Sequence, residues 1–193
     1  MTARTHDLAA ISALGALIVL YPLGTDISLA KVIAAILANQ IGGIAPDIDQ
    51  PTAPLWHNLP EGRFFGKIFG KTMGGHRFLT HSLLGVVIFG ILTRGLLIFI
   101  HPLMPHINIV IVWWAFIVGM LSHLIMDTIT KEGVPWLLPL PVKIGFPPTK
   151  AFRITTGKSM EKLLFISLLG MDIWYCAANY SHLLIVFRQI ITN

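Results

Sequence analysis

Residues 74–100, "GGHRFLTHSLLGVVIFGILTRGLLIFI", decide the fold of this chain. His76, Arg77 and His81 stand directly before an apolar run of the length that crosses about 30 Å of hydrocarbon. An ionisable side chain at the end of such a segment is costly unless it is solvated, paired or bound to a metal ion, so it is a candidate functional group. The stretch raises two questions: which other segments cross the bilayer, and which side chains surround these histidines.

The composition of the whole chain is that of a membrane protein. The 193 residues are 54% hydrophobic and 12% charged, with a mean hydropathy of +0.74, whereas a soluble domain carries about 25% charged residues. The single cysteine, Cys176, excludes an internal disulfide and a cysteine-based metal or redox motif. The net charge of +5 points to membrane topology and anionic lipid, because no basic and aromatic pattern of a nucleic-acid-binding module accompanies it.

Five apolar segments are each near the length of a transmembrane helix. They cover residues 8–24, 29–46, 82–100, 107–127 and 163–187. The connections 50–81 and 128–162 are too polar or too rich in Pro and Gly to span, yet their aromatic and aliphatic residues suit the membrane surface. We therefore predict one domain over residues 1–193, an all-α polytopic membrane helix bundle with about five transmembrane helices and two cytoplasmic interfacial loops.

Eleven of the fourteen Lys and Arg residues fall on one face of this topology. They are Arg4, Arg63, Lys67, Lys71, Arg77, Lys131, Lys143, Lys150, Arg153, Lys158 and Lys162. The positive-inside rule places this face in the cytoplasm. We expect an integral protein of a prokaryotic cytoplasmic (inner) membrane.

Seven metal-competent side chains lie at the cytoplasmic ends of the predicted helices. They are His6, Asp47, Asp49, His76, His81, His123 and Asp127. His123 and Asp127 are four residues apart, so they share one face of a helix. Asp47 and Asp49 lie between two prolines, and in an extended or turn conformation both could point the same way. The other four histidines fit amphipathic positions at the membrane interface; they are His57, His101, His106 and His182.

Imidazole and carboxylate ligands suit a divalent metal ion. Zn is the ion we expect, with Mn or Fe as alternatives, and the absence of thiolates in these motifs excludes a cysteine-type structural zinc site. Seven ligands exceed the three or four that one catalytic zinc uses. One ion surrounded by further carboxylates, or two ions, would account for them.

The motifs resemble those of the membrane-bound metal-dependent hydrolases of the YdjM/YbcI type, some of which are LexA-regulated. The resemblance lies in Thr5-His6, "PDIDQP" (46–51), "GHRFLTHSL" (75–83) and "SHLIMDTITKEGVP" (122–135), and it extends from His6 to Glu161. Gln50 stands where the family often has His, and Phe78 where it often has Gly. The resemblance implies a hydrolase, and the helical His/Asp arrangement is also similar to that of zinc-dependent phospholipase C.

These features predict a metal-dependent hydrolase that acts at the cytoplasmic face on a phospholipid or another lipid-linked ester or phosphoester. A bound divalent ion lowers the pKa of water from 15.7 toward ~7 and so supplies hydroxide at neutral pH. One of Asp47, Asp49 and Asp127 could act as general base rather than as ligand. Arg77 would stabilise developing negative charge, or it would contact a helix end or a lipid headgroup.

Two other functions stay open at this point. A metal-ion transporter or sensor is one, although transporters place their ligands near the bilayer midplane. A non-catalytic membrane protein with a metal staple is the other. The substrate and the oligomeric state do not follow from the sequence.

Three further charged residues fall within or next to the predicted spans. Arg94 and Asp172 lie at similar depths, roughly 18 Å and 14 Å from the cytoplasmic helix ends, which predicts an intramembrane ion pair. Glu161 either caps the start of the last helix or joins the metal site from it.

Overall fold

The computed structural model of the chain describes residues 1–20, 28–53, 56, 59–72, 77–140 and 142–192. The α-helices are α1 (Ala3–Leu20), α2 (Leu29–Ile44), α4 (Gly62–Thr72), α5 (Leu83–Ile100), α6 (Ile109–Thr128), α7 (Ser159–Ala178) and α8 (Tyr180–Thr192). Short 3₁₀ helices lie directly after α2 (η1, Ala45–Asp49), directly after α5 (η2, His101–Leu103) and between α6 and α7 (η3, Lys150–Phe152). No β-strand occurs in the described ranges, and the predicted all-α membrane bundle is confirmed.

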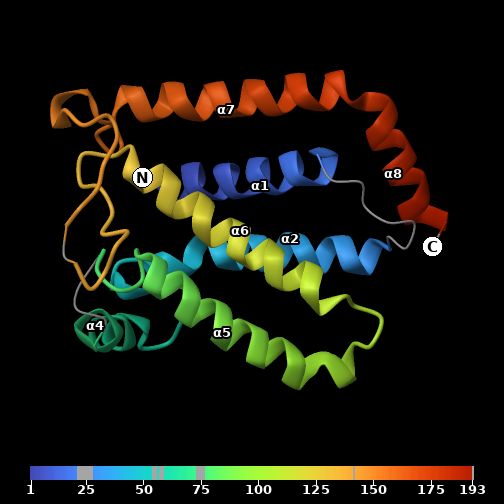
Figure 1. Cartoon of the computed structure of the whole chain (residues 1–193), viewed down its shortest axis with the longest axis horizontal. Helices are drawn as coiled ribbons and strands as arrows, with labels where there is room; N and C mark the ends of the chain where they lie inside the picture. The colour runs from blue at the N-terminus through green and yellow to red at the C-terminus, as the bar shows by residue number, and fades with distance from the viewer. Residues whose placement is uncertain (21–27, 54–55, 57–58, 73–76, 141, 193) are drawn as a thin grey trace.

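Helix α6 lies at the centre of the bundle. It packs against α2, α1 and α5, and α1 in turn packs against α2 and α7 (Figure 1). The core is apolar along α6, where Met120 and Leu124 are fully buried. By contrast, α5, α7 and α8 expose large apolar side chains such as Phe99, Trp174 and Phe187. An apolar surface of this extent suits lipid and not water.

Three helices among the described residues are long and apolar enough to cross a membrane: Leu29–Asp49, Leu83–Leu103 and Ile109–Thr128. The pair α7 and α8 would make a fourth span if it is counted as one. The sequence predicted about five, with a continuous last helix over 163–187, but the chain bends by 80° between α7 and α8. Asn179 explains the break, because its side-chain amide donates to the carbonyl of Tyr175 at 2.9 Å and ends α7. The first predicted segment, 8–24, runs into residues 21–27, outside the described residues.

The backbones of α2 and α6 touch. A Cβ atom at Gly42 would lie 2.1 Å from the carbonyl oxygen of Phe116, and one at Gly119 would lie 2.0 Å from that of Asn39. The Asn39 side chain also donates to the carbonyl of Ala115 at 3.2 Å. Small residues allow such close crossings in membranes, where packing replaces the hydrophobic effect as the driving force. The contact therefore fixes the end of α2 against the last turns of α6.

The connection 50–81 contains a helix that the sequence did not predict. Helix α4 turns Gly62, Gly66 and Gly70 toward the segment before it, and a Cβ at Gly70 would lie 2.4 Å from the carbonyl oxygen of Asp49. Its other faces carry basic residues and exposed Phe64 and Phe65. The i, i+4, i+8 spacing of the three glycines was the available signal, because it predicts one helix face. This arrangement agrees with the predicted place of the connection at the membrane surface.

The connection 129–158 lies across the end of the bundle (Figure 1). Val134 is fully buried, and its backbone exchanges two hydrogen bonds of 2.8 Å with Ile144. The indole of Trp136 donates to the hydroxyl of Thr128 at 2.8 Å, which ties the connection to the end of α6. Its outer surface exposes Leu140, Phe152 and other apolar residues, as expected of an interfacial loop.

The predicted ion pair between Arg94 and Asp172 is wrong. The Arg94 guanidinium lies 5.6 Å from the ring centroid of Trp113 on α6. The Asp172 carboxylate accepts a 2.6 Å hydrogen bond from Ser12 on α1. Similar depth did not imply proximity, because α1 and α6 lie between α5 and α7 (Figure 1).

The close crossing of α2 and α6 gives a testable prediction. Gly119→Ala should lower the free energy of unfolding by at least about 1–3 kcal/mol, because the new methyl group meets backbone and not a movable side chain. The matched control is Gly170→Ala on α7, where nothing lies within 4 Å of the added Cβ. That variant should be neutral or slightly stabilising. Thermal unfolding in one detergent compares the two, and equal midpoints would show that the backbones do not touch.

Candidate metal centre

The start of α1, the end of α2 with η1, the start of α5 and the end of α6 meet at one end of the bundle (Figure 1). This follows from the alternating direction of successive helices. It brings together His6, Asp47, His81, His123 and Asp127, which are spread over more than a hundred residues of sequence. The prediction that these motifs share one end of the bundle agrees with the geometry.

Two imidazoles of this cluster each lie close to the same two carboxylates. His81 Nε2 lies 3.7 Å from Asp47 Oδ1 and 3.6 Å from Asp127 Oδ2. His123 Nε2 lies 3.7 Å from each of the same two oxygens. Two ligands that each lie about 2.0–2.2 Å from one ion are at most about 4.4 Å apart, so each of these separations fits a shared ion. The residues can thus hold a divalent metal ion.

Hydrogen bonds fix both imidazoles in the tautomer that a metal ion requires. The Nδ1–H of His123 donates to the carbonyl of Gly43 at 2.6 Å, which leaves the lone pair on Nε2. The Thr80 hydroxyl donates to Asp49 Oδ2 at 2.5 Å, so its oxygen accepts from the Nδ1–H of His81 at 3.0 Å. Both Nε2 atoms therefore carry the lone pair on the side of the two carboxylates.

Two of the converging atoms are buried and lack a hydrogen-bond partner among the described residues, namely His123 Nε2 and Asp127 Oδ2. Their side chains are each 1% exposed. Arg77 Nη2 lies 2.8 Å from Asp127 Oδ2, but the contact is an ion pair without hydrogen-bond alignment. Buried polar atoms are normally satisfied. A cation between them would supply the missing partner.

The sequence allowed Asp47 and Asp49 to point in the same direction, but in the structure they point in different directions. Oδ1 of Asp47 approaches Nε2 of His81, whereas Oδ2 of Asp49 lies on the other side of the ring, 3.6 Å from Nδ1. The reason is that Ala45–Asp49 is a 3₁₀ helix, in which residues two apart are about 240° apart around the axis. The two carboxylates hold the His81 ring between them, and only Asp47 belongs to a group of converging ligand atoms.

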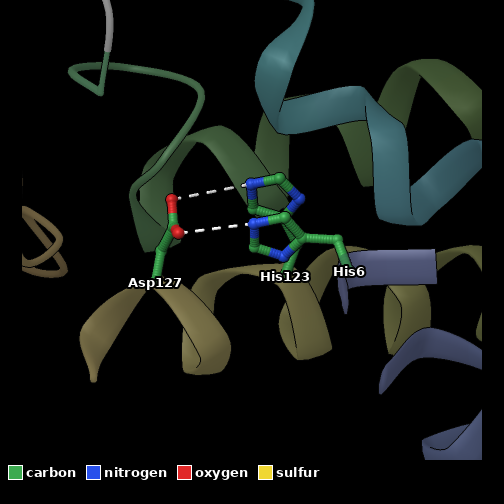
Figure 2. Close-up of side chains that lie close together, drawn as sticks. All are labelled: His6, His123 and Asp127. Carbon is green, nitrogen blue, oxygen red and sulfur yellow. Dashed lines mark ion pairs between the residues drawn. The ribbon is translucent and has the colours of Figure 1, made fainter. Parts of the chain in front are cut away.

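His6 forms a second group with His123 and Asp127. Its ring is stacked on that of His123 at 3.6 Å between centroids, and its Nε2 lies 3.3 Å from Asp127 Oδ1 (Figure 2). That oxygen also accepts a 2.7 Å hydrogen bond from the amino group of Met1. Both groups need His123 Nε2, since Nδ1 is committed to Gly43. The described ligands therefore cannot fill two complete sites at once.

Arg77 lies in the segment before α5 and contacts Asp127 of the cluster. Its guanidinium also donates to Thr130 at 3.1 Å and lies 3.4 Å from Glu132. Its backbone amide donates to Asp49 Oδ2 at 3.0 Å, in a left-handed conformation with φ of +59°. Such a φ is uncommon for a residue other than glycine and marks a backbone held in place by its surroundings. The carboxylates of Asp47, Asp49 and Asp127 outnumber the two cations beside them, the Arg77 guanidinium and the Met1 amino group, so the remaining negative charge favours a bound cation.

Other predicted members lie elsewhere or outside the described residues. His76 falls in the segment 73–76, which the structure does not describe. Glu161 is buried but turned to the start of α1, where its carboxylate accepts hydrogen bonds from Thr2, Thr5 and Gly157. It ties the residue before the N-cap of α7 to the start of α1 and does not join the cluster. The sequence missed Thr80 and the carbonyl of Gly43, and only the "THS" motif gave a signal for the former.

The fold and the buried His/Asp cluster together define an integral membrane protein with a candidate metal centre at one end of its bundle. The profile of the YdjM inner membrane protein family matches residues 1–190, so the chain belongs to that family. It is 27% identical over 175 residues to the uncharacterized protein YvsG of Bacillus subtilis strain 168, which covers 91% of this chain and 94% of YvsG. It is 28% identical over 141 residues to the inner membrane protein YdjM of Escherichia coli strain K12. That match covers 68% of this chain and 61% of YdjM, less than two thirds of the relative's length. No solved structure matches the chain.

The proposed ligands predict which substitutions lower the metal content of the protein. The purified protein should contain a divalent metal, and His123→Ala and Asp127→Ala should reduce it to background because each removes a buried ligand. Thr80→Val should keep the ligands but weaken affinity about 10- to 100-fold, since it removes the hydrogen bond that orients His81. His106→Ala, at the opposite end of the bundle, is the matched control. Inductively coupled plasma mass spectrometry of protein reconstituted with each ion makes the comparison, and equal metal in all four variants would exclude the site.

Proposed function

We propose that the protein is a metal-dependent hydrolase that acts at the cytoplasmic face of the membrane on a phospholipid or another lipid-linked ester or phosphoester. The observation that supports it most is that the ligand atoms of Asp47, His81 and His123 all lie within 4.8 Å of one another. Asp127 Oδ2 lies 3.6–3.7 Å from both imidazoles, and among the described residues His123 Nε2 and Asp127 Oδ2 are buried without a hydrogen-bond partner. The two-histidine, two-carboxylate set suits Zn, and Mn or Fe would also fit. One ion is the number that the shared His123 allows.

The ion would lower the pKa of a bound water from 15.7 toward ~7 and polarise the substrate oxygen. The chain's own residues supply the geometry. Hydrogen bonds from the two imidazoles hold them in a fixed orientation, with Gly43 as the partner of His123 and Thr80, itself bound to Asp49, as the partner of His81. The ligands therefore need not reorganise during a reaction. Asp47 is 21% exposed, whereas the other three ligands are at most 1% exposed, so substrate and water approach from the side of Asp47.

His6 is the proton acceptor that we favour. Its Nε2 lies 3.3 Å from Asp127 Oδ1, and its Nδ1 is buried without a hydrogen-bond partner among the described residues. A proton on Nε2 directed at the carboxylate leaves Nδ1 able to accept another. Asp49 is less suited, because its Oδ2 already accepts hydrogen bonds from Arg77 and Thr80. Asp127 is less suited because it is a ligand.

Arg77 would stabilise the negative charge that develops on the substrate. Its side chain is 6% exposed, and its Nε is buried without a partner among the described residues. A fixed guanidinium beside the centre favours a phosphoester over a carboxyl ester, since its planar fork matches phosphate oxygens. The contact with Asp127 holds the guanidinium within reach of the ligand cluster.

The surroundings of the centre support the proposed substrate class. The connection 129–158, next to the centre, exposes Leu140 and Phe152. Lysine and arginine residues lie between these apolar side chains. A surface that is both apolar and basic suits an anionic amphiphile at headgroup depth. A position at this end of the bundle, away from the midplane, supports an enzyme over a transporter.

Hydrolysis is tested with the detergent-purified, metal-reconstituted protein on p-nitrophenyl phosphate, bis-p-nitrophenyl phosphate and p-nitrophenyl butyrate. At least one phosphoester should be cleaved, and a chelator should stop the reaction. His6→Gln should lower kcat about 10²- to 10⁴-fold, and Arg77→Lys should lower it about 10²-fold or more, while both retain metal. His106→Gln is the control variant.

The outcomes separate the competing functions. A protein that binds stoichiometric metal but cleaves none of these substrates, nor phosphatidylglycerol in vesicles, would be a metal-stapled membrane protein. Metal-dependent uptake of the ion into sealed vesicles would instead show a transporter. Equal loss of kcat and metal in His6→Gln would make His6 a ligand and not a base.

A further inference from the structure

A groove of about 650 Å³ lies at the junction of α1 and α7. Its walls come from residues 2–5 at the start of α1 and from residues 157–166 at the start of α7. Thr5 faces this side and donates to Glu161, whereas the next residue, His6, faces Asp127. The groove and the metal centre therefore lie on two sides of the start of α1.

One end of the groove is positively charged. Arg4, Lys158 and Lys162 line it and are exposed, and none of them forms an ion pair with a carboxylate among the described residues. The one acidic side chain in the lining is Glu161, which is 2% exposed. Its oxygens accept hydrogen bonds from backbone and hydroxyl donors at 2.6–2.9 Å. The three cations are therefore available to an anion from outside.

The other end of the groove is apolar. Phe165 and Ile166 line it one to two turns further along α7, and Ile166 is 64% exposed. At 1.5 Å per residue, Ile166 lies about 12 Å along the helix axis from Lys158. Positive charge thus occupies the end of the helix, and apolar side chains follow further along it.

The backbone at the charged end is also open to a ligand. Gly157 has a φ of +77°, and a Cβ placed there would meet nothing within 4 Å. Directly after it α7 begins, and the first amides of a helix favour an anion because they lack intrahelical partners. These features add to the three cations and would not define a site without them.

We propose that this groove binds an anionic phospholipid, with the phosphate between Arg4, Lys158 and Lys162 and an acyl chain along Phe165 and Ile166. The segregation of charge and apolar surface along one groove matches the build of such a lipid. Charge-assisted hydrogen bonds from Arg and Lys select phosphate, and basic residues near a bilayer attract anionic headgroups. The site is separate from the metal centre and does not depend on hydrolysis.

Native mass spectrometry of the full-length protein in detergent tests the groove, with phosphatidylglycerol and phosphatidylcholine of identical acyl chains as probes. The wild-type protein should retain one phosphatidylglycerol with at least tenfold preference over phosphatidylcholine. The triple variant Arg4→Gln, Lys158→Gln, Lys162→Gln should lose this preference by tenfold or more. All three side chains are exposed, so metal content and the unfolding midpoint should stay at wild-type values.

The matched control is Arg63→Gln, Lys67→Gln, Lys71→Gln on α4, which removes the same charge from another basic surface. It should change the preference less than twofold. An equal loss in both triple variants would reduce the effect to general surface charge and overturn the site. Ile166→Ser should weaken phosphatidylglycerol but not inorganic phosphate. A response of both probes, or displacement of the lipid by millimolar phosphate, would show a free-phosphate site and contradict the lipid assignment.

Discussion

The direct backbone contact between α2 and α6 is the constraint on which the rest of the structure depends. Both helices run toward the same end of the bundle, and only glycine at 42 and 119 permits their approach. That approach puts the Gly43 carbonyl within hydrogen-bond reach of His123 and brings η1 with Asp47 next to the end of α6. His123 and Asp127 on α6 therefore lie close to Asp47 at the end of α2, because glycine at the crossing point lets the two helices approach closely.

Much of the fold and part of the centre could be predicted from residue pattern. The four apolar segments after the first contain helices, and the His123 and Asp127 spacing put both side chains on one helix face. Counting helix directions placed the His and Asp motifs at one end without knowledge of any contact. These predictions succeed because transmembrane helices have a fixed length and must alternate in direction.

The rest could not be predicted because it depends on local turns and lateral order. Asp47 and Asp49 separate around His81 because the turn is 3₁₀, and a proline-bracketed tripeptide does not specify that. Arg94 and Asp172 were expected at similar depths but are separated by two intervening helices, and depth alone does not identify a lateral neighbour. Asn179 ends α7 because its side chain donates a hydrogen bond to the carbonyl of Tyr175, and the hydropathy of a segment does not record such side-chain bonds to the backbone.

The wide spacing of the cluster along the chain has a consequence for biosynthesis. Its members span residues 6 to 127 and come from four separate elements. During translation, the histidine in the first helix emerges long before the carboxylate that it contacts. The His/Asp cluster therefore forms only when the fourth of these elements, α6, has been synthesised. A nascent chain that ends before residue 123 lacks the one histidine that both groups of ligand atoms share, so neither group can be complete at that stage.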